Sequence, residues 1–232
     1  MKAELCRNYL SVNHEGRFSY GGNQNWFPGQ LKRCGCAVIG AADLIWYLAR
    51  GSSMSEGKYQ KYVRRLSRSF PTIPYRGIPG FVMAVFLNIY MIRKHLPYRA
   101  HWGAGRGGIS RRVAAMIAND IPVPLCVGPA LHQILKKPAY RGLKLYKKTV
   151  GTEKAEYVWN KTIRNHFMVI TGINETWARV SSWGEAYYID LKELEEMSVK
   201  DVFGAYTNII RIEQKGGLRN KGRRQGGCCG QL

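Results

Sequence analysis

Acidic residues and long apolar runs are both scarce in this sequence. The 232 residues include 15 Asp and Glu against 36 Lys and Arg, which gives a formal net charge of +21 at pH 7. This balance favours an anionic partner, such as nucleic acid, an acidic polymer or an anionic lipid surface. No apolar run reaches the roughly 18 residues that a membrane-spanning helix needs. We therefore expect no transmembrane segment.

Signals for secretion, disulfides and metal binding are also missing. The first residues, MKAELCRNYLSVNHEG, lack the apolar core of a signal peptide, which predicts a cytoplasmic protein. The six cysteines, at positions 6, 34, 36, 126, 228 and 229, show neither CxxC nor Cys/His zinc spacing. We expect reduced thiols, no metal and no organic cofactor.

The order of periodic segments predicts an α+β fold. Helical patterns come first, at 36–50, 56–70 and 77–96, the last expected to be a buried core helix, and Ser110 is expected to cap another. Strand patterns follow at 121–128, 143–150, 166–173, 177–183, 185–191 and 205–212, with a short helix near 191–197. Helices followed by closely spaced strands favour α+β over α/β. The length fits a single domain over 1–213, and we expect the basic, Gly-rich tail at 214–232 to be disordered.

The stretch QLKRCGCAVIGAADLIWYL, residues 30–48, holds the first candidate for chemistry. Its helix is apolar on nearly every face, with Asp43 as the one clear polar break, so it should be buried. Cys36 stands in the first turn, where unpaired N–H groups and the helix dipole favour a thiolate. The sequence therefore predicts a lowered thiol pKa and a nucleophile at Cys36.

A cysteine nucleophile needs a base, and His166 is the best candidate. It heads the most apolar strand, FMVITG, which would hold the imidazole rigidly, 130 positions after Cys36. The other histidines fall in loops or near basic helix ends, and His101 in HWGAG is the strongest competitor.

These motifs together resemble the papain-like cysteine peptidases. Gln30, six positions before Cys36, and the following GCAVIGA are similar to that family's glutamine and GCWAFSA; NHFMVITG resembles its His strand, and SSWGEAYYIDL its NSWG segment. The compact spacing is closest to the bacterial bacteriocin-processing branch, the C39-like peptidases. The resemblance covers roughly residues 24–190. It implies a papain-like fold in which the cysteine helix packs on an antiparallel sheet carrying the histidine.

The resemblance also implies roles for particular residues, with three alternatives open. Ser181 aligns with the orienting Asn or Asp, although Ser182 or Asp190 can fill that role, and Trp183 walls the site. Gln30 or Gln24 forms the oxyanion hole with the backbone N–H of Cys36. Cys34, which precedes a glycine, competes with Cys36 for the nucleophile.

The implied activity is hydrolysis of peptide bonds in a peptide or protein substrate. Cys36 attacks the carbonyl, His166 carries the proton, and water resolves the thioester. Two rivals stay open: a weak or inactive papain-like module that binds nucleic acid or an acidic partner through its basic surface, and a thiol acyltransferase or amidase. The basic surface would lie on KYQKYVRRLSR and the tail.

Overall fold

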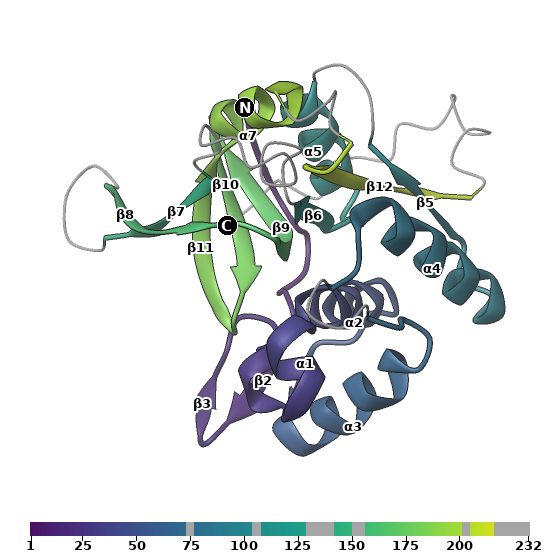
Figure 1. The fold of residues 1–232 in the computed structure, drawn as a ribbon. Helices are drawn as coiled ribbons and strands as arrows, with labels where there is room; N and C mark the ends of the chain where they lie inside the picture. Colours follow the sequence, from purple (N-terminus) through teal and green to yellow (C-terminus); the bar gives the residue numbers. More distant parts are fainter. Residues whose placement is uncertain (73–76, 104–107, 129–141, 150–155, 201–204, 216–232) are drawn as a thin grey trace.

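The computed structural model describes residues 1–72, 77–103, 108–128, 142–149, 156–200 and 205–215. Within these ranges six α-helices accompany a large antiparallel sheet, so the predicted α+β class is confirmed (Figure 1). No described helix combines the length and the apolarity that a bilayer crossing requires.

The main sheet runs in the order β5-β12-β6-β9-β10-β11-β7-β8, with β1 also pairing with β9. Its members are β1 (Lys2–Glu4), β5 (Tyr98–Trp102), β6 (Val123–Val127), β7 (Leu143–Lys148), β8 (Tyr157–Ile163), β9 (His166–Asn174), β10 (Trp177–Ser182), β11 (Glu185–Asp190) and β12 (Asn208–Gln214). Every pairing in it is antiparallel. The central strand β9 is buried at every position from His166 to Ile173, which places His166 in the interior.

Helices α2 (Cys36–Leu48) and α5 (Ile109–Ala118) both pack against β9. Nearly all of α2 is buried, as its apolar sequence predicts. Gly40 makes the close approach to the sheet possible, because a Cβ there would lie 2.8 Å from the ring of Phe167. Close packing of α2 on β9 brings Cys36 and His166 to the same region of the core.

The remaining helices surround this core. They are α1 (Gly29–Cys34), α3 (Glu56–Ser67), α4 (Gly80–Arg93) and α7 (Leu191–Lys200). A second, three-stranded sheet has the order β3-β2-β4 and contains β2 (Ser11–His14), β3 (Arg17–Phe18) and β4 (Ser53–Ser55).

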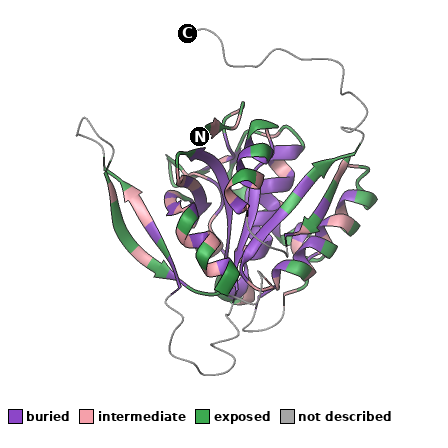
Figure 2. Cartoon of the chain, turned by 90° about the horizontal axis from the view of Figure 1, so that it is seen from above, coloured by how far each residue is buried: buried purple, intermediate pink, exposed green. Residues whose placement is uncertain are grey.

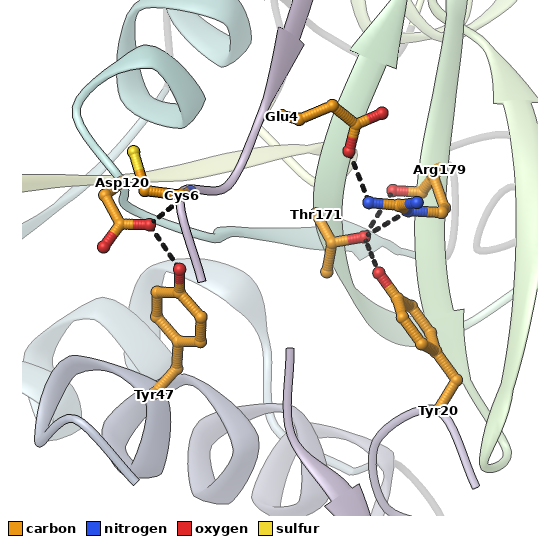
Figure 3. Close-up of polar contacts among 7 residues, drawn as sticks. All are labelled: Glu4, Cys6, Tyr20, Tyr47, Asp120, Thr171 and Arg179. Atoms are coloured by element: carbon orange, nitrogen blue, oxygen red, sulfur yellow. Dashed lines mark hydrogen bonds and ion pairs between the residues drawn. The ribbon is translucent and has the colours of Figure 1, made fainter. Parts of the chain in front are cut away.

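Polar contacts tie the N-terminal segment to the core (Figure 3). Asp120 accepts hydrogen bonds from the backbone N–H of Cys6, at 2.9 Å, and from the hydroxyl of Tyr47 on α2. Its second oxygen accepts from Nε of Arg7 at 3.0 Å. The chain that leads into β2 is therefore fixed to α2 and to the turn after α5.

Several sequence-based expectations need correction. Residues 1–29, in which the sequence patterns predict no strand, contain three short strands. Gly108, at φ 74°, caps α5, while Ser110 lies inside the first turn and bonds to Glu195. The helix expected to be buried at 77–96 is α4, and one side of it is exposed. Strand β12 extends to Gln214, and the tail from 216 onward lies outside the described residues.

Candidate active site

A small pocket lies where α2, β9 and the turn after β10 meet. Its free space, counted together with the solvent at its open mouth, is about 270 Å³. Its lining residues are Gly22, Gln24, Cys36, Ile39, Gly40, Asp43, His166, Phe167, Met168, Ser181, Ser182 and Trp183. The predicted nucleophile, the predicted base and one of the two predicted glutamines thus share a single recess.

Cys36 opens α2 directly after Gly35 and is partly buried. Burial raises the pKa of its thiol above the ordinary value of 9.0, although hydrogen bonds from the backbone of Phe167 and Ala37 act in the opposite direction. The expectation of a lowered pKa is therefore wrong. The cost of desolvating a thiolate at this site exceeds what the backbone hydrogen bonds supply.

His166 is buried and forms a hydrogen bond to a serine, but to Ser182 rather than Ser181. Its Nε2 lies 2.6 Å from Oγ of Ser182, whereas Ser181 Oγ donates to the carbonyl of Tyr20 at 2.8 Å. Burial, and secondly the charge of Lys161, lower the His166 pKa to about 3. The imidazole is therefore neutral at physiological pH, and the same low pKa makes it a weak base.

An aromatic and cationic stack covers the imidazole. The indole of Trp183 lies parallel to the His166 ring, with centroids 4.1 Å apart, and Lys161 Nζ sits 3.7 Å from the indole centroid. Trp183 has φ of 50° in the two-residue turn that it forms with Gly184. Both turn residues have positive φ, as a type I′ hairpin requires, and this conformation is costly for a bulky residue. The turn therefore holds the indole over the base at the expense of backbone strain.

The two candidate glutamines differ clearly. Gln24 lines the pocket, and one hydrogen of its Nε2 is donated to the carbonyl of Lys32 at 2.8 Å, which orients the amide and leaves the other hydrogen for a ligand. Gln30 donates from Nε2 to the carbonyl and the hydroxyl of Thr72, at 2.9 and 2.5 Å, and does not line the pocket. The geometry favours Gln24 as the oxyanion donor.

The loop before Gln24 is held from several sides. The backbone N–H of Gly22 donates to Asp43 at 2.9 Å, and the carbonyl of Gly22 accepts from Gly184 at 2.9 Å. Tyr20 is fixed by its hydroxyl, 2.6 Å from Oγ1 of Thr171 on β9, where Arg179 also donates (Figure 3). Ser181 belongs to this support, because it bonds to Tyr20 rather than to the imidazole. The hydrogen bond to the imidazole that the sequence assigns to Ser181 is made by Ser182.

Glycine is required in this loop for steric reasons. A Cβ on Gly22 would lie 1.7 Å from the hydroxyl oxygen of Tyr59. A Cβ on Gly21, whose φ is +78°, would lie 2.2 Å from Ser181 Oγ. The backbone therefore passes too close to α3 and β10 for any side chain.

Asp43, the polar break in the apolar helix, also belongs to the pocket, although its sequence context assigned it no role there. It is buried, lines the pocket, and accepts from Tyr59 at 2.6 Å as well as from Gly22. Burial raises its pKa to about 7, although these hydrogen bonds act against the shift. The available signal was its position seven residues, or two helical turns, after Cys36.

The other sequence candidates lie elsewhere. Cys34 ends α1, is buried and does not line the pocket. Asp190 accepts from the backbone N–H of Lys192 at the start of α7, and His101 lies exposed on β5, 3.5 Å from Glu213. Among the described residues, no group of three His, Cys, Asp or Glu side chains is arranged to hold a metal.

Comparisons of the chain with protein-family models, with curated proteins and with solved structures find no match.

Proposed function

We propose that this protein is a cysteine peptidase with a papain-like fold, in which Cys36 is the nucleophile and His166 the base. The observation that carries the proposal is the shared pocket: a thiol at a helix N-terminus, a neutral imidazole and a half-free amide donor line one recess. The chain order of these groups, helix first and His strand later, matches the resemblance in the sequence. Ser182 orients the imidazole and Trp183 shields it from water.

The reaction begins from an uncharged pair. His166 accepts the Cys36 proton as the sulfur bonds to the substrate carbonyl carbon, and the carbonyl oxygen becomes an oxyanion. The Cys36 backbone N–H and Gln24 Nε2 donate to that oxygen. Imidazolium then protonates the leaving amine as the C–N bond breaks. Water, deprotonated by His166, attacks the thioester, and the thiol is restored.

The proposal is tested by incubating the full chain with a diverse peptide library and identifying new termini by mass spectrometry. We expect hydrolysis by the wild type and a loss of at least about 1,000-fold in Cys36→Ser, because the hydroxyl is a much weaker nucleophile beside the same base. Cys34→Ser is the matched control and should keep its activity.

The remaining outcomes separate the rivals. Amide products that form only when an added amine acceptor is present would assign acyl transfer instead of hydrolysis. No turnover, together with steeply salt-dependent nucleic-acid binding that Cys36→Ala leaves unchanged, would assign a binding module.

The two glutamines provide a second test. Gln24→Ala should lower kcat by roughly 100-fold to 1,000-fold, because the oxyanion loses a directed donor. Gln30→Ala should leave kcat unchanged and lower the melting temperature, since it removes only the hydrogen bonds to Thr72. Equal kcat losses in both variants, measured under saturating substrate, would contradict the assignment of Gln24.

A further inference from the structure

One side of α4 is both apolar and exposed. Phe81, Val85, Ile89 and Ile92 keep 49%, 54%, 43% and 62% of their surface accessible. Their spacing of four, four and three residues places them on one face of the helix. This face, the α4 stripe, lies at the edge of the molecule, where exposed residues follow the outer side of the helix (Figure 2).

The stripe is not the face that stabilises the fold. The opposite side of α4 carries Met83, Leu87 and Met91, all fully buried in the core. Asn88 fixes the helix to β5 by bonding to the backbone N–H and carbonyl of Ala100, at 2.8 and 2.6 Å. Folding therefore leaves the stripe in water, so the free energy that burial of these side chains would supply is available to a binding partner.

The neighbouring helix α3 carries a basic surface. Lys58, Lys61, Arg64 and Arg65 are exposed on α3, and Arg68 is exposed at its C-cap. Its single acidic residue, Glu56, is engaged by His14 at 2.7 Å. Phe70, just beyond α3, joins the two helices, with its ring centroid 5.8 Å from that of Tyr90 and 6.3 Å from that of Phe86 on α4.

Positive charge also gathers at the end of the stripe. Exposed Arg93 and Lys94 follow Ile92, and α4 contains no acidic residue. The backbone N–H of Lys215 donates to the carbonyl of Pro97 at 2.7 Å, so the chain leaves β12 near this end of α4.

We propose that the α4 stripe and the basic face of α3 bind an anionic lipid bilayer surface. The stripe supplies side chains that enter the boundary between headgroups and acyl chains, and the Lys and Arg residues meet the acidic headgroups. Nucleic acid would use the charges but leave the apolar stripe in water. A second copy of the chain would bring two surfaces of the same positive sign together. The proposal does not depend on the peptidase activity.

The test is flotation of the full chain with vesicles of phosphatidylcholine alone, or of phosphatidylcholine with 30% phosphatidylglycerol, taken as about the anionic share that gives a strong surface potential. We expect binding only to the anionic vesicles and weaker binding as salt is raised. The double change Val85→Ser and Ile89→Ser should lower the partition coefficient by at least about tenfold, because two apolar side chains no longer enter the bilayer. All variants should keep the wild-type circular dichroism spectrum.

Matched controls on α7 distinguish the effect of this face from the effect of removing any exposed apolar or basic side chain. Val199→Ser removes an equally exposed valine, with 56% accessible against 54% for Val85, and should bind like the wild type. Arg64→Ser with Arg65→Ser should weaken binding, whereas Lys192→Ser with Lys200→Ser should weaken it less. Absence of flotation, equal losses in the controls, or a dimer that dissociates in the Val85→Ser and Ile89→Ser variant would overturn the proposal. So would nucleic-acid binding in place of vesicle binding.

Discussion

Alkylation of Cys36 by iodoacetamide should accelerate about 100-fold between pH 7 and pH 9. The reactive species is the thiolate, and its fraction grows about tenfold per pH unit below the pKa. Burial in the pocket raises the Cys36 pKa above its ordinary value, so the rise should continue through this whole range. The rate at Cys36 is followed by peptide mapping, with the exposed Cys6 in the same sample as the reference.

His166→Gln makes this experiment more specific. Because the His166 pKa is near 3, the imidazole carries no charge between pH 5 and 9 and does not stabilise a thiolate. The variant should therefore keep the alkylation profile of the wild type while losing peptide hydrolysis. A reactivity plateau below pH 7 that disappears in His166→Gln would instead indicate a preformed thiolate–imidazolium pair, and the neutral starting state would be wrong.

Cys36 and His166 line the same pocket, and each belongs to a strongly patterned element of the sequence. Cys36 stands at the start of a helix that is apolar all round, and His166 at the head of a fully buried strand. Such elements have to meet in the core, and the absence of a side chain at Gly40 allows their close contact. Periodicity therefore carried the information about these two positions.

The supporting residues depend on short-range geometry that no sequence pattern encodes. Ser181 and Ser182 are neighbours, and the end of β10 decides which hydroxyl reaches the imidazole. Gln30 has the six-residue spacing from Cys36 that the resemblance requires, yet its side-chain amide donates a hydrogen bond to Thr72. Lys161 reaches Trp183 from β8, a strand that was not predicted because its residues are mostly exposed.

The sequence does not predict the exposed side of α4, and the reason is a different one. A helix apolar on all faces is normally assigned to the core, and half of α4 fits that assignment. Exposure of the other half follows from where the chain places its neighbours, namely β5 and Phe70. Hydrophobicity alone does not distinguish a core face from a binding face.

The buried pair Asp43 and His166 should give pH effects on stability of opposite sign. The Asp43 pKa is about 7 in the folded protein against 3.8 ordinarily, so the folded state holds the extra proton and stability falls as pH rises from 4 to 7. The His166 pKa is about 3 against 6.5, so the unfolded state holds the extra proton and stability falls as pH drops from 6.5 to 3. Between pH 4 and 6.5 the two slopes should cancel.

A variant that lacks one of the two groups should show the pH dependence of stability that the other group causes. In Asp43→Asn, the free energy of unfolding should rise relative to wild type by about 1.4 kcal/mol per pH unit from 4.5 to 6.5, since only His166 still titrates. In His166→Gln it should fall by about the same amount per unit, because Asp43 then acts alone. Urea unfolding at pH 4.5, 5.5 and 6.5 measures both, and differences from wild type remove the titration of all groups common to the three proteins.

Parallel curves for wild type and Asp43→Asn would mean that the carboxyl beside Gly22 ionises at its ordinary pKa. The loop that carries Gln24 would then be held by a charged carboxylate throughout this range. Mirror-image slopes would instead mean that the same hydrogen bonds hold the loop while the carboxyl gains or loses its proton near neutral pH.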